Sequence, residues 1–260
     1  MIPPIKLIST DFDGTLFAEF EMPPIPKALE TRLADLQARG VKWAINTGRD
    51  MSSLMEALAR SQVSIQPDFL VLVEREIYEH DGNRYVGLQH WNKACAHDHA
   101  ELFARVRPDV PRLNDWVSSR FRATVYEDAF SPFCLIAGNN GDADRIHQFL
   151  DQYCQTVPGL VVVRNDVYAR FSHVAYNKGT ALAELGRRLG VGPESVLAAG
   201  DHLNDLPMLK RNCARWLVGP VNAVEAVKSA LHHEGGYVSG LPHGHGVADG
   251  LKWALEQTGQ

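Results

Sequence analysis

Short apolar runs alternate with segments of helical periodicity at both ends of this chain, and no other feature constrains the fold as strongly. Residues 5–9 form an apolar run that ends in a polar turn, and Leu29, Leu33 and Leu36 then recur at helical spacing before Gly40. Strands that alternate with helices usually form a parallel sheet covered on both faces, so we predict an α/β core. Its predicted strands are 5–9, 41–45, 68–73, 195–199 and 215–218, and its later helices are 178–189, 205–209, 221–231 and 247–256.

The pattern changes after the turn Asp81-Gly82-Asn83. From there a helix followed by two strands is predicted twice, which is typical of a mixed or antiparallel α+β module. We therefore predict an inserted domain at 83–171 and a core formed by 1–82 and 172–260. The predicted elements of the insert are helices 91–106 and 142–152 and strands 120–126, 133–137, 160–164 and 167–171.

Composition and charge exclude several classes of protein. With 45% apolar and 22% charged residues among 260, the chain has the composition of a soluble globular protein rather than a disordered or fibrous one. A net charge of -5 without any Lys/Arg tract argues against nucleic acid or a membrane surface as a partner. Four scattered cysteines favour reduced thiols, and no secretory signal is visible. We expect a cytoplasmic monomer or small homo-oligomer that acts on a small molecule.

Reactive side chains follow the predicted strands or open the predicted helices. In an open α/β sheet the carboxyl ends of the strands share one edge, so these side chains should meet there. Converging carboxylates would repel one another unless a cation neutralised them, and ligands that are all oxygen suit Mg²⁺. The residues concerned are Asp11, Asp13, Thr47, Lys178, Asp201 and Asp205.

Lys178 stands in the first turn of its predicted helix, where its charge opposes the helix dipole. The same helix end attracts anions, so the lysine and the helix together favour a bound phosphate, to which Thr47 adds a hydroxyl donor. Together with a carboxylate nucleophile and a divalent cation, these groups make a phosphoryl-transfer site. Each signal has an ordinary alternative: a chance Asp-x-Asp, a surface lysine, or a helix N-cap at Asp50 or Asp205. Their coincidence at strand ends favours chemistry.

Four segments of the chain resemble the four motifs of the haloacid dehalogenase (HAD) superfamily of phosphohydrolases. They are Asp11-Phe12-Asp13-Gly14-Thr15, Thr47-Gly48-Arg49, Asn177-Lys178-Gly179 and Gly200-Asp201-His202-Leu203-Asn204-Asp205. The insert between the second and third motifs resembles the cap of the IIB subgroup, which includes Cof-type sugar phosphatases, sucrose-phosphate phosphatases and phosphomannomutases. The resemblance implies a Rossmann-like core with an α+β cap, and a sugar phosphate or phosphorylated glycoside as substrate.

The resemblance also implies a role for each motif residue. Asp11 would be the nucleophile that forms an aspartyl-phosphate, and Asp13 would protonate the leaving alcohol and then activate water. Dehalogenases of the superfamily lack this second carboxylate, so its presence favours phosphate esters. The implied phosphate-binding residues are Thr47, Gly48 and Lys178; the implied Mg²⁺ ligands are Asp11, Asp201 and the carbonyl of Asp13; and the implied supporting residues are Asn204 and Asp205.

Two departures from the family pattern are expected to leave the chemistry untouched but to alter the rim of the active site. Relatives usually carry Asn-Gly after the third strand, where this chain has Glu74-Arg75-Glu76, and many Cof-type members have a Glu where Arg170 stands. A metal site at His243 and His245 has the ordinary alternative of a turn before the last helix. In the insert, a sugar ring could stack on Trp91 or Trp116, although packing of these side chains in the core of the insert is the simpler interpretation. A second anionic group of the substrate could bind to arginines on the predicted strands, although a solvated surface is the simpler interpretation for them. These arginines are Arg120, Arg122, Arg164 and Arg170.

Two functions compete with that of a phosphatase. A hexose phosphomutase would share both the motifs and the type of cap. A catalytically silent binding module would keep the fold, but it would have no need of all four of Asp11, Asp13, Lys178 and Asp201.

Overall fold

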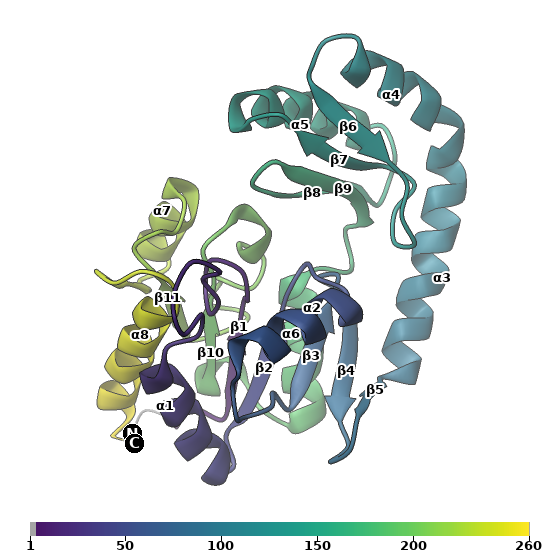
Figure 1. Ribbon diagram of the computed structural model, residues 1–260. Helices are drawn as coiled ribbons and strands as arrows, with labels where there is room; N and C mark the ends of the chain where they lie inside the picture. The colour runs from purple at the N-terminus through teal and green to yellow at the C-terminus, as the bar shows by residue number, and fades with distance from the viewer. Residues whose placement is uncertain (1–3, 260) are drawn as a thin grey trace. The chain divides into compact units, whose positions relative to one another are not determined.

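The protein is described from a computed structural model that covers residues 4–259. The chain divides into two compact units (Figure 1). Unit 1 combines the segment that ends at Gln89 with the segment that begins at Lys178, and unit 2 consists of His90–Asn177. No helix within residues 4–259 combines the length and the apolar character needed to cross a membrane.

Unit 1 is built on an eight-stranded sheet, counted over the described residues, in the order β12-β11-β10-β1-β2-β3-β4-β5. All neighbours from β12 to β3 pair in parallel, which confirms the predicted α/β core. Every residue of β1, β3, β10 and β11 is buried, and since successive side chains point to opposite faces, both faces of the sheet are covered. The parallel strands are β1 (Leu7–Thr10), β2 (Lys42–Asn46), β3 (Phe69–Leu72), β10 (Val196–Ala199), β11 (Trp216–Gly219) and β12 (Tyr237–Val238).

The helices of unit 1 follow the predicted apolar periodicity. Leu29, Leu33 and Leu36 form the buried side of α1, and the Asp50 side chain caps α2 by accepting a hydrogen bond from the Ser53 amide. The described helices are α1 (Lys27–Ala38), α2 (Met51–Ser61), α6 (Lys178–Leu189), α7 (Glu225–His233) and α8 (His243–Thr258), with short 3-10 turns η2 (Pro193–Ser195) and η3 (Leu203–Asp205).

Three helices of unit 1 depart from their predicted bounds. The helix predicted at 221–231 is α7, which begins at Glu225 and ends at His233. The helix predicted at 205–209 is only the 3-10 turn η3, which begins two residues earlier. The last helix begins at His243 rather than at residue 247, and it includes two glycines that sequence reasoning assigned to a turn. Gly244 packs on Pro26 and Gly246 on Pro220 so closely that a Cβ would lie within 3 Å of either proline. These glycines therefore bring the helix against the rest of unit 1.

A hairpin that the sequence did not predict extends the sheet. β4 (Glu76–His80) pairs antiparallel with β3, and β5 (Tyr85–Gly87) pairs with β4. Ile77 is the one fully buried residue of β4, so its apolar pattern is too weak to detect. Because β5 belongs to the core sheet, the boundary falls at Gln89/His90 and not after residue 82. The second boundary, at Asn177/Lys178, likewise lies beyond the predicted residue 171.

Unit 2 contains a four-stranded antiparallel sheet in the order β6-β7-β9-β8. The predicted helix-strand-strand repeat is present, with an additional helix, α4, whose Pro111 lies in its first turn, where proline is tolerated. Trp116 stacks on Phe149 with 3.6 Å between ring centroids, next to the core. The elements are α3 (Gln89–Val106), η1 (Arg107–Asp109), α4 (Val110–Ser118), β6 (Ala123–Tyr126), β7 (Cys134–Ala137), α5 (Asn140–Cys154), β8 (Leu160–Asn165) and β9 (Tyr168–His173).

Candidate active site

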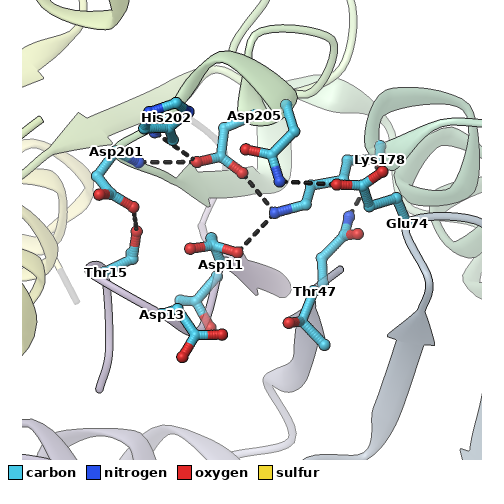
Figure 2. Close-up of polar contacts among 12 residues, drawn as sticks. Asp11, Asp13, Thr15, Thr47, Glu74, Lys178, Asp201, His202 and Asp205 are labelled. Atoms are coloured by element: carbon cyan, nitrogen blue, oxygen red, sulfur yellow. Dashed lines mark hydrogen bonds and ion pairs between the residues drawn. The ribbon is translucent and has the colours of Figure 1, made fainter. Parts of the chain in front are cut away.

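The carboxyl ends of neighbouring parallel strands in unit 1 bring together residues that lie far apart in the sequence (Figure 2). β1 lies between β10 and β2, and the chain leaves these strands through Asp11, Asp201 and Thr47 respectively. Lys178 is the first residue of α6, and Asp205 ends η3. The parallel topology therefore assembles these side chains at one edge of the sheet, as predicted.

Lys178 is the centre of this cluster. Its side chain is fully buried, and Nζ donates to Oδ1 of Asp11 and to Oδ1 of Asp205, each at 2.6 Å. Burial lowers the pKa of Lys178, but the charges of Asp11, Asp205 and Glu74 outweigh it and hold the pKa above its ordinary value. Lys178 is thus a permanent buried cation, which excludes the alternative of a solvated surface lysine.

Three carboxylates lie close enough to hold a metal ion. One oxygen from each of Asp11, Asp201 and Asp205 lies within 4.8 Å of the other two. Burial, and next the charge of Asp205, raises the pKa of Asp11 well above its usual range and that of Asp201 to about 6. A cation would relieve this repulsion, and the all-oxygen donor set suits a hard divalent ion.

Two further observations concern which atoms could contact a metal ion or its ligands. Both oxygens of Asp205 are already engaged, because Oδ1 accepts from Lys178 and Oδ2 accepts from the amides of Asp201 and His202 at 2.8 and 2.9 Å. Asp11 and Asp201 therefore have more oxygens available for a metal ion than Asp205 has. Nearby, the buried Oδ1 of Asn204 has no hydrogen-bond partner within residues 4–259, so it could accept from a donor that arrives with an ion or a substrate.

Asp13 does not belong to this acidic cluster in the structure. Its carboxylate forms a bidentate ion pair with Arg49, with both nitrogen–oxygen distances at 2.7 Å. The guanidinium also lies 5.5 and 5.9 Å from the ring centroids of Phe12 and Phe17. Sequence reasoning quoted Arg49 as part of a motif but assigned it no partner.

The sequence profile of the haloacid dehalogenase-like hydrolases matches residues 115–251, just over half of the chain. The chain belongs to this family. The resemblance inferred from the four motifs is thereby confirmed, although the matched region begins after the first two of them.

Two relatives of this hydrolase are named as phosphatases. The 5-amino-6-(5-phospho-D-ribitylamino)uracil phosphatase of Bacillus subtilis is 25% identical over 257 residues, which cover 96% of each chain. The phosphoglycolate phosphatase of Methanopyrus kandleri is 40% identical over 82 residues, 32% of this chain and 33% of that protein. The prediction of an HAD-type phosphatase enzyme is confirmed at this level.

Solved structures share the fold of this hydrolase. The sucrose-phosphatase of Synechocystis, in complex with sucrose and phosphate, matches with a TM-score of 0.71 at 19% identity over 97% of this chain and 98% of that one. A haloacid dehalogenase-like hydrolase of Bacteroides thetaiotaomicron matches with a TM-score of 0.64 at 19% identity, over 96% and 99%. These likenesses extend over both units of the chain.

One residue of the hydrolase's site was assigned by sequence reasoning to the rim. Glu74 is 6% exposed, and its Oε1 accepts a hydrogen bond of 2.7 Å from Nδ2 of Asn204. At Glu74, the departure from the family pattern therefore lies deeper than the rim, since its side chain is buried and hydrogen-bonded to Asn204. The signal that could have revealed it is a charged residue directly after a fully apolar strand, the same signal that marked Asp11.

Thr47 and the loop that follows it are held by the β3–β4 turn. The Thr47 carbonyl accepts from the Glu74 amide at 2.9 Å, and its hydroxyl oxygen accepts from the Arg49 amide at 3.2 Å. The hydroxyl proton of Thr47 is left to donate. Gly48 lies between these two anchored residues.

The histidines, tryptophans and arginines singled out in the sequence do not belong to the acidic cluster. His243 lies with Nδ1 3.0 Å from the Gly14 carbonyl oxygen, whereas His245 lies 3.8 Å from Glu21, so the two histidines serve different contacts. In unit 2, Trp91 packs edge-on against Tyr176, and Arg164 is buried in an ion pair with Asp144. Among the described residues, the acidic cluster is the one group of three or more His, Cys, Asp or Glu that could hold a metal.

The raised pKa values predict a pH-dependent effect of Mg²⁺ on stability. An Asp whose pKa is about 6 in the folded state and lower in the unfolded state binds more protons when folded, so without metal the free energy of unfolding falls as the pH rises between these values. A divalent ion competes with those protons. We expect Mg²⁺ to raise the melting temperature more at about pH 7.5 than at about pH 5, measured by differential scanning fluorimetry. An equal increase in melting temperature at both pH values would show that Mg²⁺ does not bind to these carboxylates.

Proposed function

We propose that this hydrolase is an Mg²⁺-dependent phosphatase that acts on a small phosphorylated metabolite, a sugar phosphate or phosphorylated glycoside, through an aspartyl-phosphate. The observation that carries the proposal is the buried ammonium of Lys178, which lies 2.6 Å from the carboxylates of both Asp11 and Asp205 beside a third acid, Asp201. This arrangement supports the proposal, because the hydrolysis of a phosphate ester requires a nucleophile close to positive charge that can bind the phosphoryl group.

In the proposed reaction, an oxygen of Asp11 attacks phosphorus and displaces the substrate alcohol, which leaves with a proton supplied by Asp13. Asp13 then takes a proton from water, and the water oxygen attacks the phosphorus of the aspartyl-phosphate to release inorganic phosphate and restore the Asp11 carboxylate. Lys178 and the hydroxyl of Thr47, with the amide of Gly48, bind the phosphoryl oxygens. Asp11, Asp201 and the Asp13 carbonyl would hold Mg²⁺, which would supply positive charge to the carboxylates and the phosphoryl group.

Asp13 must exchange partners during this reaction. As long as both of its oxygens accept hydrogen bonds from Arg49, neither oxygen is free to exchange a proton with the leaving alcohol or with water. Substrate binding must therefore free at least one oxygen of Asp13 from Arg49. Asp205 and Asn204 act through neighbouring residues. Asp205 accepts hydrogen bonds from Lys178 and from the amides of Asp201 and His202, and Asn204 donates a hydrogen bond to Glu74.

The substrate class is supported by the named relatives. The Bacillus subtilis relative is named for a phosphorylated ribityl compound, and the Synechocystis enzyme was solved with sucrose and phosphate. Each of these compounds carries several hydroxyl groups, and each is linked with phosphate in the description of that protein. We also propose that unit 2 serves as the cap, as the resemblance implies.

The decisive experiment is release of inorganic phosphate from a panel of phosphorylated sugars, glycerates and nucleotides. We expect the highest kcat/KM on a sugar phosphate or phosphorylated glycoside. Conversion of a hexose phosphate that depends on a bisphosphate activator and releases no net phosphate would show the mutase instead. Binding without any turnover would show a silent module.

Removal of divalent metal should abolish the activity. We expect EDTA to reduce phosphate release from p-nitrophenyl phosphate to background and Mg²⁺ to restore it, because the acidic cluster would otherwise repel the anionic substrate. The same titration followed by fluorimetry should show that Mg²⁺ raises the melting temperature of the metal-free enzyme. Full turnover in EDTA would contradict the role of the cluster.

A further inference from the structure

The turn between β3 and β4 has an unusual backbone. Val73 and Glu74 both adopt positive φ, 51° and 65°, and both are buried. A left-handed conformation is rare for residues other than Gly, Asn and Asp, and it is an outlier for a β-branched valine. Strain of this kind persists only where the surroundings impose it, and it gathers at functional sites. An Asn-Gly, which the family resemblance implies for this region, would adopt such a turn without strain.

The backbone of this turn holds the phosphate-binding loop. The Val73 amide donates to the Arg49 carbonyl at 3.0 Å, and the Glu74 amide donates to the Thr47 carbonyl at 2.9 Å. The turn is therefore fastened to both ends of the Thr47-Gly48-Arg49 segment. The same conformation directs the Glu74 side chain into the site, where Figure 2 shows it beside Lys178.

The carboxylate of Glu74 determines which way the Asn204 amide points. A carboxylate offers only acceptors, so the Asn204 atom that lies 2.7 Å from Oε1 must be the donor Nδ2. The opposite orientation would bring two acceptor oxygens into contact. Oδ1 of Asn204 is consequently the atom left over, and this buried oxygen has no partner within residues 4–259. The side chain of Asn204 is only 7% exposed, so an acceptor without a hydrogen bond destabilises the fold there unless a ligand donates a hydrogen bond to it.

Glu74 also adds negative charge around Lys178. Its charge is the third, after those of Asp11 and Asp205, that raises the pKa of the lysine. Glu74 is buried and is absent from the proposed chemical steps, so neither solvation nor proton transfer accounts for its presence.

We propose that Glu74 is a positioning residue of the phosphatase site, an inference that rests on the proposed function. It holds Asn204 so that Oδ1 is available to accept a hydrogen bond from a group that arrives with the metal ion or the substrate. The carboxylate acts through Asn204 and does not itself contact the reacting atoms. The strained turn is the structural consequence of placing that carboxylate between the phosphate-binding loop and Asn204.

Two substitutions of Glu74 separate positioning from folding. Glu74→Gly removes the carboxylate but favours the observed φ, so we expect an undiminished melting temperature together with a kcat/KM about 10- to 100-fold lower and weaker half-activation by Mg²⁺. Glu74→Gln keeps an acceptor for Asn204 through its amide oxygen, so it should recover most of the loss. The matched control is Glu76→Gln, because Glu76 lies two residues away and bonds to the Tyr78 hydroxyl; it should behave as wild type.

The outcomes distinguish this inference from the proposed function. The positioning role would be overturned if Glu74→Gly had the kcat/KM and the Mg²⁺ dependence of wild type. It would also be overturned if both variants lost activity only in proportion to a lowered melting temperature, because the loss would then reflect unfolding. If wild-type protein releases no phosphate from any substrate, the proposed function fails. The role of Glu74 is then judged by the Mg²⁺-induced rise in melting temperature, which should be smaller in Glu74→Gly than in wild type; an equal rise would overturn it.

Discussion

Replacement of Asp11 by Asn should reduce the release of phosphate from p-nitrophenyl phosphate by a factor on the order of 10⁴ or more, because the amide cannot form the covalent intermediate. The protein should remain folded. Asp11 is buried and its pKa is raised mainly by burial and by the charge of Asp205, so a neutral side chain of the same shape removes repulsion as well as an ion pair. Lys178 keeps Asp205 as a partner.

Three measurements accompany this substitution. Circular dichroism and the melting temperature should match those of wild type within a few degrees, on the order of what a 1 kcal/mol change produces. Asp35→Asn, an exposed change on α1, is the matched control and should leave turnover unchanged. Near-normal turnover by Asp11→Asn would exclude the covalent role of this carboxylate.

Replacement of Lys178 by Met should affect stability and activity together. The substitution leaves the buried carboxylates of Asp11 and Asp205 without their shared cation, and breaking a buried ion pair in this way costs about 3 to 5 kcal/mol. Phosphate release should fall to background as well, because no buried ammonium remains to bind the phosphoryl oxygens. Urea unfolding with and without Mg²⁺ measures the first effect, and a colorimetric phosphate assay measures the second.

Mg²⁺ provides an internal check on the Lys178 substitution. A divalent ion among the carboxylates replaces part of the lost positive charge, so it should stabilise Lys178→Met more than it stabilises wild type. Lys252→Met, which removes an exposed lysine of α8, should change neither stability nor turnover by a measurable amount. A Lys178→Met protein as stable as wild type in EDTA would show that the ion pairs contribute nothing to the fold.

The accuracy of the sequence-based predictions followed the strength of the apolar pattern. The helix predicted at 178–189 has those bounds in the structure because its buried face, which includes Ala181, Leu182 and Leu185, repeats at helical spacing. The β4–β5 hairpin was missed because it lies at the edge of the sheet and buries little. Helix α4 was missed because Pro108 suggested that the preceding helix is broken there and no new helix was predicted after it, although Pro111 lies in the first turn of α4. A proline in the first turn of a helix is compatible with the helix and conceals it from pattern analysis.

For the candidate site, too, some features were predicted from the sequence and others were not. Asp11, Lys178 and Asp201 were predicted to meet because each stands at a strand end or a helix start, and such places converge in any parallel sheet. The pairing of Asp13 with Arg49 and the entry of Glu74 into the site were not predicted. Both depend on side-chain direction, which in the case of Glu74 follows from a left-handed backbone that its residue type does not favour.

By itself, the amino-acid sequence determined the alternation of strands and helices, the interruption by a second unit, and the acids and the lysine that meet at the edge of the core sheet. These features follow from local periodicity and from the fixed direction of parallel strands. Tertiary structure alone decided that Lys178 is fully buried between Asp11 and Asp205, that Arg49 holds Asp13, and that Glu74 orients Asn204. Those contacts join residues up to 167 positions apart, and their geometry depends on how the whole sheet packs.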